Sequence, residues 1–120
     1  MTVLPANVKL GSSDSVNLTC NARGQSPGVM FMSISKVKDD GSVTPLVELI
    51  PYSQQPIFLD DDFLSRSQAF GSLDSALGEY LTAVIHRPKQ IDGGRYRCDI
   101  NYVHIHGVDH LSSYATVTVS

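Results

Sequence analysis

The feature that most constrains the fold of this chain is the stretch Asp92-Gly93-Gly94-Arg95-Tyr96-Arg97-Cys98. Because strand side chains alternate between two faces, Tyr96 and Cys98 share one face if the stretch is extended. Cysteine and aromatic rings both favour burial, so we expect that face to point into a core. A buried tyrosine hydroxyl needs an acceptor, and a tight corner at Gly93-Gly94 can offer a backbone carbonyl. The sequence therefore predicts a chain reversal fixed by a buried tyrosine just before a strand.

Four of these residues fit the Asp-x-Gly-x-Tyr-x-Cys signature of the F strand of immunoglobulin-superfamily domains: Asp92, Gly94, Tyr96 and Cys98. Residues 16–20, Val-Asn-Leu-Thr-Cys, resemble the strand B pattern of the same family. The resemblance implies an all-β fold in which two antiparallel sheets pack as a Greek-key sandwich, with a tyrosine corner at Tyr96. It also implies a disulfide from Cys20 to Cys98 that joins the two sheets.

The disulfide that the resemblance implies bears on where the protein works. Structural disulfides persist in oxidising environments, so the bridge favours an extracellular protein, either secreted or the ectodomain of a surface protein. The alternative is a pair of buried thiols in a cytosolic protein. The stretch Met1–Pro5 lacks the basic and apolar regions of a signal peptide. We therefore interpret the chain as a domain excised from a longer protein, with an added start methionine.

Length and charge narrow the class of protein further. A chain of 120 residues is the size of one domain, so we expect residues 1–120 to form a single immunoglobulin-like unit. The net charge of −3 argues against nucleic acid as a partner. No apolar run is long enough to cross a bilayer, so we expect no membrane insertion by this domain.

Alternation of apolar and polar residues predicts the regular strands. They are expected over residues 15–22, 29–37, 43–50, 80–86 and 111–119. An Asp40-Gly41 hairpin turn between the second and third of these strands favours the variable-type arrangement of the family. The residues expected to face the core are Val16, Leu18, Cys20, Met30, Met32, Ile34, Leu81, Ala83 and Ile85.

The remaining segments give weaker patterns. Residues 2–4 and 7–10 predict short edge strands, and residues 64–73 should contain another strand. Residues 51–63 predict a long loop or a ragged short strand, and residues 103–109 predict a loop.

One of these segments also carries a competing helical pattern. Apolar residues recur at helical spacing between residues 70 and 84, but Gly71 and Gly78 interrupt the pattern. The flanking cysteines of the expected sandwich also require strands, which leaves a single helical turn near Leu73–Leu77 as the alternative.

The resemblance gives structural roles to three further positions. Most immunoglobulin domains place a tryptophan against the disulfide, but this chain contains none, and spacing from Cys20 puts Met32 about where that ring would lie. In variable-type domains an aspartate at the place of Asp92 pairs with an arginine near the start of the strand within 64–73. Arg66 is the arginine in that region, so we expect a partly buried Arg66–Asp92 ion pair.

Three polar groups raise the question of bound metals and of modification. His104, His106 and His110, with Asp109, have donor types that would suit zinc, but we interpret them as a histidine-rich surface loop. The run Asp60-Asp61-Asp62 lacks the Asp-x-Asp-x-Asp-Gly pattern of a calcium loop and predicts a solvated acidic loop. We therefore expect no metal and no cofactor. Asn17-Leu18-Thr19 is a glycosylation sequon with Asn17 facing outward.

The sequence shows no catalytic motif and predicts a protein that is not an enzyme. It has no Gly-x-Ser-x-Gly, no His-Glu-x-x-His and no phosphate-binding loop. In variable-type domains the sheet that carries the predicted hairpin is the usual contact surface, so the resemblance implies recognition of a protein or glycan partner. The candidate contact residues are Phe31, Leu46 or Val47, Tyr102, His104, His106 and His110.

A narrower resemblance concerns three short stretches: Ile34-Ser35-Lys36-Val37, Ala69-Phe70-Gly71-Ser72 and Tyr96-Arg97-Cys98-Asp99. They look like the N-terminal immunoglobulin domains of molluscan fibrinogen-related proteins, which are secreted lectin-like defence proteins of haemolymph. This resemblance implies pathogen-surface recognition in innate immunity. Two alternatives stay open. One is a homophilic adhesion or allorecognition receptor domain that forms a homodimer, and the other is a structural spacer in a longer chain.

Overall fold

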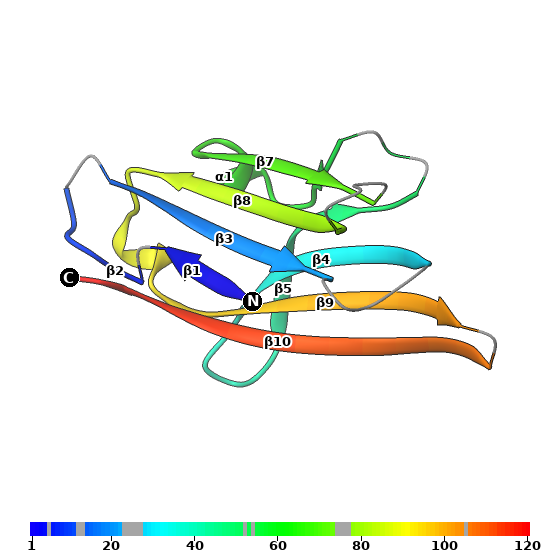
Figure 1. Ribbon diagram of the computed structural model, residues 1–120. Helices are drawn as coiled ribbons and strands as arrows, with labels where there is room; N and C mark the ends of the chain where they lie inside the picture. The colour runs from blue at the N-terminus through cyan, green and yellow to red at the C-terminus, as the bar shows by residue number, and fades with distance from the viewer. Residues whose placement is uncertain are drawn as a thin grey trace.

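Two β-sheets pack face to face, one above the other in Figure 1. The computed structural model describes residues 1–4, 6–11, 14–22, 28–51, 53, 55–73, 78–104 and 106–120. One sheet has four strands in the order β1-β3-β8-β7, and the other has six in the order β2-β10-β9-β4-β5-β6. The described pairings are antiparallel except for the parallel pair β2 and β10.

The chain passes between the two layers in Greek-key fashion. The four-stranded sheet contains β1 (Thr2–Leu4), β3 (Ser15–Asn21), β7 (Ser67–Ser72) and β8 (Tyr80–His86). The six-stranded sheet contains β2 (Asn7–Val8), β4 (Val29–Val37), β5 (Val43–Leu49), β6 (Ile57–Phe58), β9 (Gly94–His104) and β10 (Gly107–Val119). One helical turn, α1 (Asp61–Leu64), precedes β7, and a short 3-10 helix, η1 (Gln90–Asp92), precedes β9.

The core lies between the sheets and follows the predicted alternation in β3 and β8. Val16, Leu18 and Cys20 are fully buried, and so are Leu81, Ala83 and Ile85 on the paired strand β8. Cys20 and Cys98 form a disulfide with their Cα atoms 5.7 Å apart. This bond joins β3 of one sheet to β9 of the other, which confirms the bridge and the two-sheet sandwich that the resemblance implied.

Strand β4 departs from the predicted pattern at its start. Met30 was expected to face the core, but it is 42% exposed, and Val29 is buried instead. The cause is a shift in register with β9 between Val29 and Phe31, because an extra residue in one strand interrupts the alternation of faces.

The residue opposite Cys98 on β4 is Ile34. Met32, which was expected near the disulfide in place of a tryptophan, lies opposite Ile100 and is fully buried. The alternation therefore puts both side chains in the core, and Ile34 is the strand neighbour of the disulfide.

The predicted loop over residues 103–109 is largely a β-hairpin. β9 continues to His104, β10 begins at Gly107, and Val103 pairs with Val108. The β-branched valines favour strand, and Gly107, with a φ of 134°, supplies the backbone conformation that a tight turn requires. In Figure 1 this hairpin reaches beyond the other strands at the end of the sandwich opposite the C-terminus.

The segment from 51 to 63 forms a ragged short strand, β6, and then an unexpected helical turn, α1. The run of aspartates predicted as a solvated loop starts this turn, because the Asp60 carboxylate accepts the Phe63 N–H at 2.9 Å. Phe63 is thereby turned into the core. The helical alternative for residues 70–84 is wrong where the structure describes them, since β7 and β8 are strands. Residues 74–77, where a single turn was the alternative, lie outside the described residues.

The tyrosine corner precedes the disulfide, as predicted. The buried Tyr96 hydroxyl donates to the backbone carbonyl of Asp92 at 2.6 Å. Gly94 has a φ of 126°, and a Cβ atom there would lie 2.9 Å from Lys36 Nζ, so this position requires glycine. The Lys36 ammonium lies 4.6 Å from the centre of the Tyr96 ring and donates to the carbonyls of Ile91 and Gly93. The corner is therefore held both by the Tyr96 hydroxyl and by the Lys36 ammonium.

We expect Tyr96→Phe to lower the free energy of unfolding by about 1–3 kcal/mol at neutral pH, because the buried Asp92 carbonyl loses its donor. Burial and the nearby Asp92 carboxylate raise the pKa of Tyr96 above its ordinary value of 10.0. A raised pKa contributes stability that is present below the ordinary pKa and is lost as pH rises through the folded one. The difference between the two proteins should therefore shrink above pH 10.0 in urea unfolding across a pH series. A difference that stays constant with pH would contradict this account.

Candidate functional site

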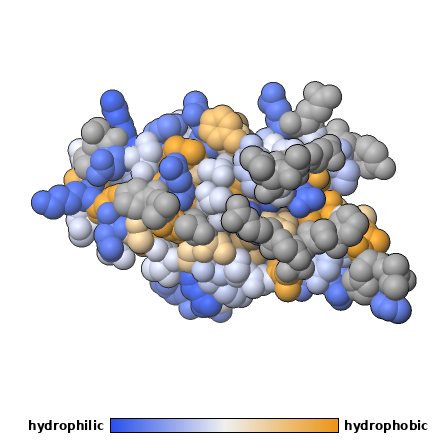
Figure 2. Space-filling model, viewed as in Figure 1, coloured by the Kyte–Doolittle hydropathy of each residue, from blue (hydrophilic) through white to orange (hydrophobic). Residues whose placement is uncertain are grey.

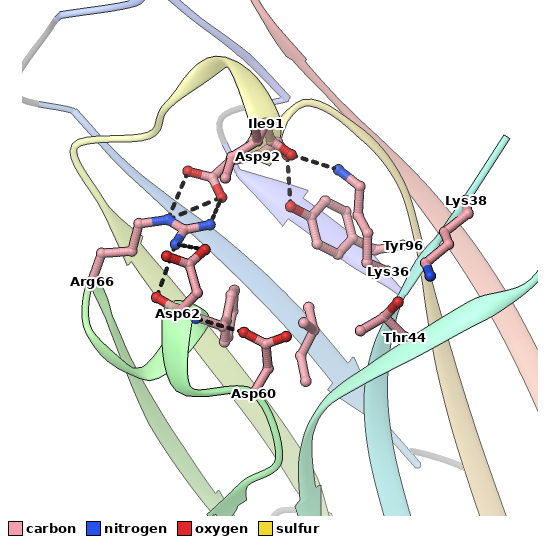
Figure 3. A pocket seen from close by; sticks show the side chains of 11 residues that line it. Lys36, Lys38, Thr44, Asp60, Asp62, Arg66, Ile91, Asp92 and Tyr96 are labelled. Atoms are coloured by element: carbon pink, nitrogen blue, oxygen red, sulfur yellow. Dashed lines mark hydrogen bonds and ion pairs between the residues drawn. The ribbon is translucent and has the colours of Figure 1, made fainter.

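A first polar cluster closes one end of the sandwich, around the Arg66–Asp92 ion pair (Figure 3). Arg66 Nη2 lies 2.5 Å from Asp92 Oδ1, and Arg66 Nε lies 3.2 Å from both carboxylate oxygens. Asp92 Oδ2 also accepts the Lys89 N–H at 2.7 Å. The Asp92 side chain is 2% exposed and that of Arg66 is 13% exposed. Hydrogen bonding to Asp92 raises the pKa of Arg66, and this ion pair is the one that the family resemblance led us to expect.

A pocket of about 150 Å³ lies beside this ion pair. Figure 3 shows that its polar side chains point at one another or at the backbone. Arg66 also donates to Asp62 Oδ2 at 2.6 Å, and the Lys36 ammonium is satisfied by two backbone carbonyls. Burial lowers the pKa of Lys36. Because Arg66 pairs with Asp62 and Asp92, we interpret this end of the molecule as architecture that seals the sandwich.

A second polar cluster lies on the outward face of the six-stranded sheet. Asp99 Oδ2 accepts from Arg97 Nε at 2.8 Å, while Asp99 Oδ1 accepts from Ser112 Oγ at 2.7 Å and lies 3.0 Å from His110 Nε2. His110 Nδ1 lies 2.5 Å from Asn101 Oδ1. We call these five residues, Arg97, Asp99, Asn101, His110 and Ser112, the Asp99 cluster. They come from neighbouring positions of β9 and β10, which the register of the hairpin brings together.

Asp99 is buried although it faces away from the core. Its side chain is only 6% exposed, because Arg97 and His110 lie against it and β4 supplies small neighbours. Ser33 lies opposite Asp99 and Ser35 opposite Arg97, and both serines are buried. The carboxylate is fully satisfied, and hydrogen bonding to it raises the pKa of Arg97. The partners of Asp99 still reach solvent: the side chain of Arg97 is 30% exposed and that of His110 is 53% exposed.

Apolar and aromatic groups surround the Asp99 cluster on the same face. Tyr114 lies opposite Arg97 and stacks under the Arg95 guanidinium, whose carbon is 4.0 Å from the ring centre. Val103 and Val108 form an exposed pair near the end of the hairpin. Figure 2 shows apolar side chains scattered among polar ones, without one dominant patch in that view. This mixture of charged, aromatic and small aliphatic groups can make oriented hydrogen bonds and stacking contacts with a polar partner.

The contact residues proposed from the sequence do not all lie on the outward face of the sheet. Phe31 lies opposite Asn101 on the outward face, and His110 belongs to the Asp99 cluster. Either Leu46 or Val47 was expected to face outward, but both are buried, because the register of β4 and β5 shifts between Ile34 and Ser35 and leaves Leu46 as an extra residue. Tyr102, also expected outward, packs against the core.

Among the described side chains, His106 does not join the Asp99 cluster in a metal site. His106 is exposed in the turn of the hairpin, and the side chain of His104 lies outside what the structure describes. Among the described residues, no group of three or more histidine, cysteine, aspartate or glutamate side chains could hold a metal ion.

Sequence reasoning missed four members of the cluster: Arg97, Asp99, Asn101 and Ser112. A signal was present, because Arg97, Asp99 and Asn101 alternate with the inward residues of β9 and must share the outward face. The partners on β10 could not be identified without the register of the hairpin.

The opposite side of the molecule carries the glycosylation sequon. Asn17 lies in β3, opposite Val84 of β8, and is exposed. It therefore faces away from the core on the four-stranded sheet, and the Asp99 cluster lies on the other sheet.

Greek-key order in two layers, a tyrosine corner and an inter-sheet disulfide together define the fold class as an immunoglobulin-like β-sandwich. No protein-family model matches the chain, and a search of curated proteins finds no match. Within the described part of the chain, no helix has the length and hydrophobicity needed to cross a membrane.

Proposed function

We propose that this chain is an extracellular recognition domain of the immunoglobulin superfamily, without enzymatic activity, that binds a protein or glycan on another surface. The observation that carries the proposal is the Asp99 cluster. Burying a carboxylate costs free energy, and this one lies outside the apolar core, so the packing of the sandwich does not require it. Its effect is to hold the exposed parts of Arg97 and His110 in fixed positions on an open sheet face.

Fixed donors on a sheet face favour recognition over the spacer alternative. Orientation of charged groups before binding reduces the ordering cost that association would otherwise carry. A guanidinium, an imidazole and an aromatic ring within one face suit hydroxyl-rich or carboxylate-bearing partners, such as glycans of a microbial surface. Together with the resemblance to molluscan fibrinogen-related proteins, this supports innate-immune recognition by a secreted lectin-like protein.

Two further features support an extracellular setting. The buried disulfide is the kind that persists in oxidising compartments. A glycan on Asn17 would cover the outward face of the four-stranded sheet and leave the Asp99 cluster free.

The test is binding of the fluorescently labelled domain to bacterial cells, to yeast cells and to an array of microbial polysaccharides. We expect His110→Ala to weaken binding about tenfold or more, because it removes an exposed imidazole ring that offers a stacking face to the partner. The matched control is Phe70→Ala on the outward face of the four-stranded sheet, since Phe70 is 52% exposed and the His110 side chain 53%. Both variants should stay folded, and the melting temperature of His110→Ala should fall only modestly, because Asp99 keeps its hydrogen bonds from Arg97 and Ser112.

Two outcomes would overturn the proposal. If the domain binds none of the three probes, recognition of a pathogen surface is excluded. If the protein is also strictly monomeric, the result favours the spacer alternative. Equal loss of binding in His110→Ala and Phe70→Ala would show that the Asp99 cluster is not the contact surface.

A further inference from the structure

Among the described strands, β10 has a neighbour on one side only along most of its length. β9 pairs with it from Gly107 to Val117, whereas β2 pairs with Thr118 and Val119 alone. Among the strands that the structure describes, no other lies beside β10 in the sheet. Residues 107–117 therefore form a free edge, which Figure 1 shows along the outer side of the β9–β10 hairpin.

The direction of the backbone groups on this edge follows from the short pairing with β2. The Thr118 N–H donates to the Ala6 carbonyl at 2.8 Å, and the Ser120 N–H donates to the Val8 carbonyl at 3.0 Å. The register with β9 is unbroken from Gly107 to Val117, and backbone direction alternates along a strand, so every second residue before Thr118 also points away from β9. These residues are Val108, His110, Ser112, Tyr114 and Thr116.

The edge lacks the devices that usually prevent strands from pairing with another chain. Natural edges are short, bulged, or protected by proline and lysine. Residues 107–117 contain no proline, lysine or arginine, and their pairing with β9 shows no bulge. By contrast, the outermost strands β1, β2 and β6 have 3, 2 and 2 residues, and β7, the outermost strand on the other side of the four-stranded sheet, has 6. The free part of β10 is thus the edge of this fold best suited to accept a further strand.

The sequence of the edge fits a second copy of itself. A two-fold axis at Ser112 would set Val108 opposite the second copy's Thr116, and His110 opposite the second copy's Tyr114. Asp109, the one carboxylate of this segment, would lie opposite the second copy's Ala115, so like charges do not face each other. In this antiparallel register, the outward N–H and C=O groups of each copy meet the complementary groups of the other.

We propose that two copies of this domain associate through the free edge of β10, antiparallel and centred near Ser112, to form one continuous sheet. The proposal goes beyond recognition by the Asp99 cluster, because it uses the backbone of the edge and leaves the outward face open. The two clusters would then lie on the same side of the joined sheet, so a surface with repeated ligands is bound bivalently.

The first test compares Tyr114→Pro with Tyr114→Ala in sedimentation equilibrium up to millimolar protein. Both variants lose the ring, but only proline removes the N–H that faces the second copy. Proline is tolerated on an edge where the N–H faces solvent, so the monomer should still fold, as circular dichroism will check. We expect Tyr114→Pro to raise the dimer dissociation constant about tenfold or more relative to Tyr114→Ala.

The second test needs no variant and distinguishes this interface from a face-to-face dimer. Residue-resolved hydrogen exchange should show amides of even-numbered residues from Val108 to Thr116 protected at high concentration and exchanging on dilution. The amides of the intervening residues, which face β9, should stay protected at both concentrations. A strict monomer at millimolar concentration would overturn the proposal, and so would a dimer in which the even-numbered amides exchange freely.

Discussion

Replacement of both cysteines, Cys20→Ala with Cys98→Ala, is expected to lower the free energy of unfolding by about 4.5 kcal/mol. The two residues are 78 positions apart, so the bond closes most of the chain into one loop. In the chain-entropy account a loop of roughly that length restricts the unfolded state by this amount. The total stability of a small domain is about 5–15 kcal/mol, so the variant should be close to unfolded at room temperature.

Urea unfolding of the oxidised protein, the reduced protein and the double variant measures this effect. The reduced parent controls for the atoms that alanine removes, and it should unfold at nearly the same urea concentration as the double variant. Because both sulfurs are buried, the folded protein should resist a reductant until it is partly unfolded. A loss below about 1 kcal/mol in both samples would contradict the assigned role of the bridge.

Removal of the Arg66 guanidinium is expected to cost about 3–5 kcal/mol, the second largest effect. Arg66→Ala leaves the Asp92 carboxylate, 2% exposed, without its ion-pair partner. The same carboxylate orders the corner through the Lys89 N–H, and the Asp92 carbonyl accepts from Tyr96, so the loss should spread to the start of β9. Thermal and urea unfolding should therefore both shift strongly.

Asp62→Ala is the matched control, because Asp62 pairs with the same arginine at 2.6 Å but has a side chain that is 64% exposed. An exposed pair contributes about 0–1 kcal/mol, so this variant should stay close to the parent protein. Equal effects of Arg66→Ala and Asp62→Ala would show that burial of Asp92 does not set the cost. A substitution of both Arg66 and Asp92 by apolar residues should recover part of the stability, since no charge is left unpaired.

The sequence predicted the parts of the fold that depend on the pattern of residues within one short segment. Alternation in residues 16–20 and 81–85 identified the inward faces of β3 and β8, because side chains two apart must share a face. The spacing of Tyr96 and Cys98, with Gly94 before them, predicted the corner. The disulfide and the Arg66–Asp92 pair were found only through resemblance to a family, since spacing alone does not say which residues meet.

The candidate site was predicted less well, because it depends on partners from different strands. Either Leu46 or Val47 was expected on the contact face, but the extra residue Leu46 in β5 leaves both buried, and no local signal in the sequence gives the position of such a register shift. Asp99 and His110 are 11 residues apart, and they meet only because His104 pairs with Gly107 and fixes the register of the hairpin.

The sequence by itself thus determined which residues are buried within a regular strand, since alternation is a property of one strand. Tertiary structure decided which strand lies opposite which, where the register shifts, and which edge of the sheet has no neighbour among the described strands. These follow from long-range pairing, whose free energy depends on residues far apart in the chain, so they could not be read from any single segment.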